Sequence, residues 1–97
     1  MTTVIVSHTV ADFDTWKPVY DAHDGRRAAG CQTADVYRSA EDGNAVTIVM
    51  TYPSADAAQA FLNDPSLKEA MKDAGVQGAP DITILELEDS VVHEGAA

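Results

Sequence analysis

Hydrophobic and polar positions in this chain repeat with two different periods. A period of two residues, typical of strands, marks four segments, at residues 4–10, 33–39, 45–52 and 81–88. A helical period of about 3.6 residues marks residues 12–29 and 54–75. The order is therefore β-α-β-β-α-β. It predicts an α+β fold of the ferredoxin-like kind, a four-stranded antiparallel sheet that carries its helices on one face only.

The first strand has the pattern of a strand buried on both faces, because one set of alternating residues is Val4, Val6, His8 and Val10 and the other is Ile5, Ser7 and Thr9. Helices on one side of the sheet would leave the other side in water unless something covers it. A second copy of the chain is the simplest cover, so the pattern predicts a homodimer closed face to face into a dimeric α+β barrel. We expect a single domain over residues 1–88 and a tail over residues 89–97 that frays or crosses onto the partner.

Turn chemistry gives the expected connections between the strands. Glu-Asp-Gly-Asn at residues 41–44 predicts a hairpin loop in which Ala40 lies opposite Ala45. That register places Tyr37 opposite Ile48, so these two side chains should share a face of the sheet. The Gly-Ala-Pro sequence at residues 78–80 is expected to be the loop that leads into the last strand.

Composition narrows the classes of partner. The 97 residues include 16 Asp and Glu against 6 Lys and Arg, a formal net charge of -10, which repels nucleic acids and anionic lipid surfaces. No apolar run approaches the ~20 residues that cross a bilayer, so no membrane association is expected. The first strand begins too early for a signal peptide, and Cys31 is the single cysteine, so we expect a cytoplasmic protein without an intrachain disulfide.

Candidate functional residues lie on the first helical stretch, whose inward stripe is not purely apolar. Its members at helical spacing include Trp16, Tyr20, His23 and Arg27. If His8 on the first strand points toward this helix, His8 and His23 line one cavity, with Tyr37 as a further wall. Either imidazole could then take a hydroxyl or enol proton from an aromatic or polyketide-like molecule. The two histidines are thus the candidate catalytic residues, and the other four are candidate substrate contacts.

A structural interpretation of the same residues remains open. The two histidines could be hydrogen-bonded core groups, the aromatic residues could be ordinary core packing, and Arg27 could pair with Asp24 or Asp35. The three histidines of the chain lack metal-ligand spacing, and the sequence contains no Gly-rich phosphate loop or nucleophile motif. Neither a metal nor an organic cofactor is therefore expected.

Three segments resemble a group of small bacterial proteins: DFDTWKPVYDAH at residues 12–23, the hairpin at residues 41–45, and DPSLKEAMKDAGVQGAP at residues 64–80. The group is part of the dimeric α+β barrel superfamily, near the antibiotic biosynthesis monooxygenase-like proteins, and its members are often called cyclase-like. The resemblance implies a homodimeric small-molecule enzyme, for example a cofactor-independent monooxygenase or a cyclase acting on a hydrophobic aromatic substrate. Haem-degrading relatives are less similar, because residues 64–75 contain no histidine. The alternative is a non-catalytic ligand-binding or accessory protein.

Overall fold

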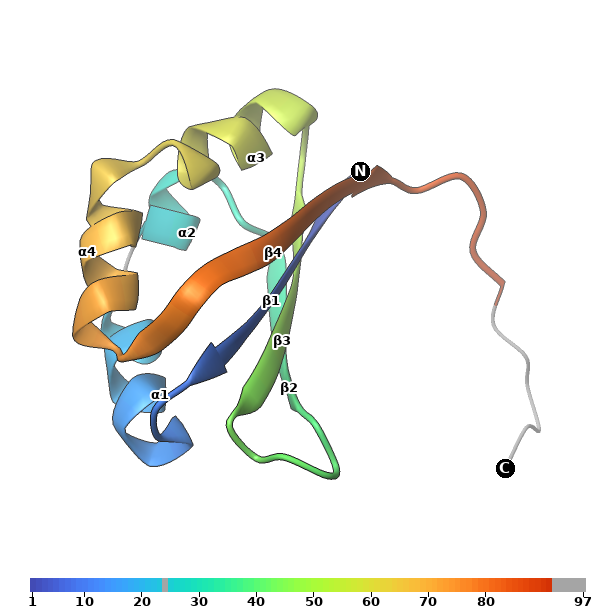
Figure 1. Cartoon of the computed structure of the whole chain (residues 1–97). Coiled ribbons are helices and arrows are strands. Elements are labelled where there is room, and N and C mark those ends of the chain that lie inside the picture. The colour runs from blue at the N-terminus through green and yellow to red at the C-terminus, as the bar shows by residue number, and fades with distance from the viewer. Residues whose placement is uncertain (24, 92–97) are drawn as a thin grey trace.

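Four antiparallel strands form one sheet in the order β2-β3-β1-β4, as Figure 1 shows for the computed structural model. The structure describes residues 1–23 and 25–91, with Arg27 described by its backbone alone. The strands are β1 (Thr2–Val10), β2 (Thr33–Arg38), β3 (Ala45–Tyr52) and β4 (Val76–Glu86). The helices are α1 (Phe13–Ala22), α2 (Gly25–Ala28), α3 (Ala55–Leu62) and α4 (Pro65–Asp73). The predicted α+β, ferredoxin-like arrangement is confirmed.

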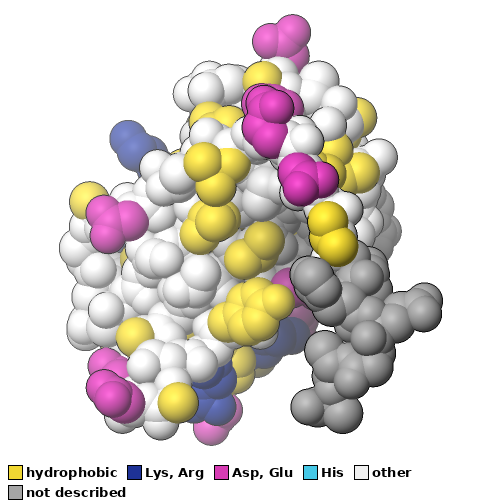
Figure 2. Space-filling model, turned by 90° about the vertical axis from the view of Figure 1, so that its right-hand side faces the viewer, with side chains coloured by type: hydrophobic (Ala, Val, Ile, Leu, Met, Phe, Trp, Pro, Cys, Tyr) yellow, Lys and Arg dark blue, Asp and Glu magenta, His cyan; other side chains and the backbone are white. Residues whose placement is uncertain are grey.

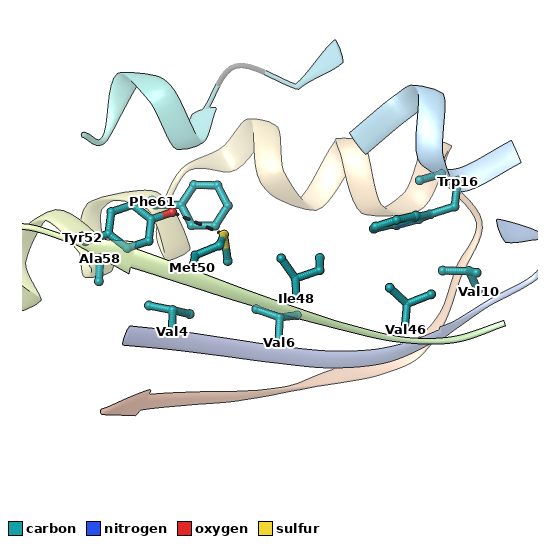
Figure 3. Close-up of a cluster of buried hydrophobic side chains, with 11 residues drawn as sticks. Val4, Val6, Val10, Trp16, Val46, Ile48, Met50, Tyr52, Ala58 and Phe61 are labelled. Atoms are coloured by element: carbon teal, nitrogen blue, oxygen red, sulfur yellow. Dashed lines mark hydrogen bonds between the residues drawn. The ribbon is translucent and has the colours of Figure 1, made fainter. Parts of the chain in front are cut away.

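All four helices lie on one side of the sheet, and the hydrophobic core fills the space between (Figures 1 and 3). Alternate residues of the two central strands supply its floor: Val4, Val6 and Val10 from β1, and Val46, Ile48, Met50 and Tyr52 from β3. Trp16, Ala58, Phe61 and Ala74 complete the core from the helix side. The other side of the sheet has no helix against it in the described part of the chain.

The second half of the helical layer follows local sequence signals. The Ser54 hydroxyl caps α3 by accepting the backbone N–H of Ala57 at 3.2 Å. The Asp64 carboxylate caps α4 by accepting the N–H of Ser66 at 2.9 Å, and Pro65 occupies the first turn, where a missing N–H costs nothing. Gly75 ends this region in the left-handed conformation, with φ +81°.

The first helical stretch is not one continuous helix, which corrects the expectation for residues 12–29. α1 ends at Ala22, His23 has extended backbone, and α2 begins at Gly25. A Cβ atom on Gly25 would lie 2.6 Å from Cε1 of His23, so a larger residue at this position would have to displace the His23 ring. A helical wheel drawn through the whole stretch therefore loses its phase after His23.

The expected hairpin register is wrong by one residue. Val36, not Tyr37, lies opposite Ile48, and Tyr37 lies opposite Thr47. The loop begins one residue earlier than predicted because the Ser39 hydroxyl accepts the N–H groups of residues 41 and 42. A one-residue shift moves every side chain of a strand to the other face, so Tyr37 lies on the uncovered side of the sheet.

Residues 78–80 are not a loop before the last strand, as the sequence suggested, but part of β4 itself. Ser7 pairs with Asp81 and Thr9 pairs with Gln77, so the three intervening residues of β4 lie opposite His8 alone. Such a bulge suits an edge strand, where Pro80 needs no ladder donor. The ladder between β1 and β4 is therefore interrupted beside His8.

Residues 87–91 follow β4 without regular structure. Residues 87–91 are exposed, and residues 92–97, which make up most of the predicted tail, lie outside the described residues. The domain bounds of 1–88 and the path of the tail stay predictions. None of the helices described is long and apolar enough to cross a membrane.

Candidate functional site

A cavity of about 50 Å³ lies between the helices and the sheet, near the bulge of β4. Its walls are apolar and come from the two central strands, α1, α3 and α4. They include Val6, Trp16, Val19, Ile48, Met50, Phe61, Leu67, Ala70, Met71 and Ala74. Four polar side chains interrupt this lining: His8, Tyr20, His23 and Arg26. Four of the six sequence candidates thus line one cavity, namely His8, Trp16, Tyr20 and His23.

Aromatic contacts connect these polar groups in a row. The ring of His8 meets the edge of Trp16 at 5.6 Å between centroids, and Trp16 stacks on Tyr20 at 4.8 Å. The guanidinium of Arg26 covers the outer face of Tyr20, with Cζ 3.7 Å from the ring centroid. Figure 3 shows the ring of Trp16 lying over the sheet above Val46. We call His8, Trp16, Tyr20 and Arg26 the aromatic row.

His8 occupies the inner end of the aromatic row. Its side chain is 9% exposed, and its Nδ1 atom is buried without a hydrogen-bond partner in the part of the chain that the structure describes. Burial lowers the pKa of His8 below its usual 6.5, and an interaction of the ring with the backbone of His8 itself offsets part of this decrease. The ring is therefore neutral near pH 7. A neutral imidazole with an unused nitrogen, facing an apolar cavity, is chemically equipped to accept a proton.

His23 connects two helices. Its Nε2 lies 3.0 Å from the hydroxyl of Ser66, which in turn donates to the Asp64 carboxylate at 2.9 Å. With the Ser66 proton used in this way, His23 must donate from Nε2. The two hydrogen bonds from Ser66, backbone and side chain, lower the pKa of Asp64. We call this group the His23–Ser66–Asp64 clasp, since it links the end of α1 to the first turn of α4.

The order of groups in the clasp excludes the usual activation of a serine nucleophile. In a catalytic triad the histidine lies between serine and carboxylate, so that it can remove the hydroxyl proton. Here the serine lies between the other two and gives its proton to the carboxylate. His23 thus lines the cavity with its Nε2 engaged by Ser66, which leaves Nδ1 as its acceptor nitrogen.

Tyr20 offers a phenol rather than a phenolate to the cavity. Burial is the largest influence on this group and raises its pKa, while the nearby Arg26 acts in the opposite direction. The phenol therefore keeps its proton at neutral pH and can donate it in a hydrogen bond. Its faces are occupied by Trp16 on one side and Arg26 on the other.

Two sequence candidates do not join the cavity as described. Tyr37 is 57% exposed on the uncovered side of the sheet, for the register reason given above. Arg27 lies in α2, and its side chain is outside the described part of the structure. Arg26 is the functional residue that the sequence analysis missed, because the helical projection of residues 12–29 treats them as one unbroken helix. Gly25, two residues after His23, was the signal that the helix restarts.

Among the described residues, no three His, Cys, Asp or Glu side chains lie close enough together to hold a metal ion. We therefore assign no metal site there.

Comparison with known proteins gives a family and a fold. Residues 18–73 match the family described as antibiotic biosynthesis monooxygenase. SnoaB, a cofactor-independent oxygenase from Streptomyces nogalater, has a similar structure, with a TM-score of 0.77 and 14% identity over 95% of this chain and 97% of that one. No protein of curated function matches the sequence.

Two further solved structures share the architecture. A proposed antibiotic biosynthesis monooxygenase from Caulobacter crescentus has a TM-score of 0.73 and 21% identity, over 91% of this chain and 90% of that one. A proposed antibiotic biosynthesis monooxygenase from Deinococcus radiodurans has a TM-score of 0.72 and 17% identity, over 98% of this chain and 100% of that one. At these identities the structural likeness shows the fold.

Proposed function

Because this chain belongs to the antibiotic biosynthesis monooxygenase family, we propose that it is a cofactor-independent monooxygenase acting on a hydrophobic aromatic substrate. The observation that carries the proposal is the side chain of His8, a buried neutral imidazole that lines an apolar cavity and whose Nδ1 has no hydrogen-bond partner among the described residues. The similar fold of SnoaB, a cofactor-independent oxygenase, supports the same class of reaction.

In the proposed reaction, His8 removes a proton from an activated methylene or hydroxyl group of the substrate. The resulting electron-rich anion reacts directly with O₂, so the substrate itself supplies the electrons. At a methylene, one oxygen atom becomes the new carbonyl and the other leaves as water with the two hydrogens. Trp16 forms a wall of the site, and the phenol of Tyr20 supplies a hydrogen-bond donor. A cyclase would begin with the same proton removal but would consume no O₂.

The size of the cavity requires part of the helical layer to move when a substrate binds. About 50 Å³ holds only a few water molecules, since each needs roughly 10–15 Å³ by this measure. α4 is the natural element to move, because none of its residues is fully buried although Leu67, Ala70 and Met71 line the cavity.

Oxygen uptake with a dihydroxyanthrone as probe, in the presence of a chelator, tests the reaction. We expect protein-dependent uptake above the spontaneous rate, and a loss of about 100-fold in kcat for His8→Asn, which keeps a planar polar group but no base. Quenching of Trp16, the single tryptophan, reports probe binding separately. Undiminished turnover in His8→Asn would refute the role of His8. Probe conversion without O₂ uptake would favour a cyclase, and binding without conversion would favour a ligand-binding protein.

We also propose that the chain works as a homodimer, closed through the uncovered face of the sheet. Figure 2 views this face: apolar side chains lie across it and acidic side chains lie toward its edges. By their positions in the strand pairing, Ile5, Tyr37, Val49 and Leu85 belong to this face. An apolar sheet face of this kind is normally covered in antiparallel folds. A cytoplasmic location is part of the proposal, since the lone Cys31 suits a reducing compartment.

A further inference from the structure

Arg26 lies where the cavity opens to the surface. Its side chain lines the cavity, and it also lines an adjoining surface groove together with Asp21, Gln32 and Thr33. The groove is polar, whereas the cavity is apolar apart from the four groups named above. A ligand entering the cavity from this side would therefore pass the guanidinium.

The guanidinium is held firmly but keeps most of its donors. It lies over the ring of Tyr20, and its Nη2 donates to the Tyr20 carbonyl at 3.2 Å. Among the residues that the structure describes, Arg26 forms no ion pair, and the carboxylate of Asp21 is engaged by Lys17 at 2.6 Å. An arginine stays charged at any physiological pH and has five N–H donors in a planar fork.

No acidic partner of Arg26 is found among the described residues, which do not include the neighbouring Asp24. A half-buried guanidinium with free donors at the mouth of a cavity is instead suited to an anion from outside, which it can bind through two parallel hydrogen bonds.

We infer that Arg26 is the specificity-determining residue of this site and that the substrates are aromatic compounds carrying a carboxylate. The inference rests on the proposed function and adds the substrate class. The order of groups along the aromatic row then fits such a molecule. The row begins with a neutral base at His8, continues with the aromatic faces of Trp16 and Tyr20, and ends with the cation of Arg26. The apolar body lies inside, and the carboxylate stays at the mouth.

A matched pair of probes tests the inference: naphthoate and its neutral methyl ester, titrated by quenching of Trp16 fluorescence. We expect the wild-type protein to bind naphthoate at least about 10-fold more tightly than the ester, the size of effect that one charge-assisted hydrogen-bonded pair supplies. Arg26→Gln should weaken naphthoate binding by about 10-fold and leave ester binding within about 2-fold. Added salt should weaken naphthoate binding to the wild-type protein and spare the ester.

Arg38→Gln is the control variant. Arg38 also stacks on an aromatic ring, with Cζ 4.0 Å from the centroid of Phe13, and donates to a backbone carbonyl at 2.9 Å, but it does not line the cavity. It should change neither affinity. Arg26→Lys keeps the charge without the planar stack and should retain the preference for naphthoate, which guards against a glutamine variant that folds poorly.

The outcomes separate the inference from the proposed function. Equal wild-type affinity for the two probes, or equal weakening of both by Arg26→Gln, would overturn the role of Arg26 while leaving an aromatic-binding cavity. Failure of the ester to bind at all would instead refute the cavity as an aromatic site, and the inference with it.

Discussion

His8 couples the protonation of the site to the stability of the fold. Because burial lowers its pKa below 6.5, the unfolded chain takes up this proton at a higher pH than the folded chain. The free energy of unfolding should have its full value above about pH 6.5 and fall as the pH drops below it, by up to about 1.4 kcal/mol per pH unit for this one proton. The decline should stop once the folded ring is itself protonated.

Urea unfolding of the wild-type protein and of His8→Asn between about pH 7.5 and about pH 5 measures this coupling. In the variant, the free energy of unfolding should lose the part of its pH dependence that His8 causes. The free energies of unfolding of the two proteins should therefore approach each other as the pH falls. Parallel curves would show that folding does not disfavour the charged form of His8.

At the scale of single residues, sequence periodicity predicts a shared cavity for some candidates and fails for others. His8 and Trp16 meet because each belongs to an element whose phase is regular up to that residue. Arg26 escapes prediction because α1 ends before His23 and the helix restarts at Gly25, and the His23 ring beside this break is bonded to Ser66 of α4, a tertiary contact that periodicity does not encode. The unused Nδ1 of His8 also cannot be predicted from sequence, since it depends on what every neighbouring element leaves unfilled.

α4 is held at its first turn by polar contacts more than by buried ones. The His23–Ser66–Asp64 clasp joins it to α1, while its inward side chains are only partly buried. We expect Ser66→Ala to cost about 0.5–1 kcal/mol, the net worth of an ordinary hydrogen bond, and to speed local opening of the helix. Hydrogen exchange should accelerate at the amides of α4 and stay unchanged in β1 and β3.

Ser54→Ala is the matched control for this experiment. It removes the capping hydroxyl of α3, a serine hydroxyl at the first turn of the neighbouring helix, so faster exchange should appear in α3 rather than α4. If Ser66→Ala leaves exchange in α4 unaltered, the clasp does not hold that helix, and the entry route for a substrate must be sought elsewhere.

At the scale of elements, the hydrophobic pattern predicts their order and type but not every boundary. Period-two alternation identifies β1 and β3 because one full side of each is buried. The hairpin register fails because it depends on Ser39, whose hydroxyl binds two loop amides, rather than on any hydrophobic position. The predicted start of β4 is wrong because Gly78 and Pro80 are common in loops as well as in bulges.

At the scale of the whole molecule, the hydrophobic pattern of β1 predicts an assembly of two chains. Apolar residues on both sides of β1 predict that both sides of the sheet are covered, and the helices cover only one. Ile5 and Val49 lie opposite each other in the strand pairing, near the middle of the uncovered face. Burial of such a face by a second copy would contribute stability that this small domain lacks alone.

Sedimentation velocity at micromolar concentration tests this prediction, and the wild-type protein should sediment with twice the 10.3 kDa mass of one chain. Val49→Asp should yield monomers, because two-fold symmetry brings the new charge near its own copy in an apolar contact, and an unpaired buried carboxylate costs several kcal/mol. Ala60→Asp adds the same charge to an exposed position of α3, on the other side of the sheet, and should leave the dimer intact. A monomeric wild-type protein would refute the dimer. A Val49→Asp protein that remains dimeric would move the interface to another surface.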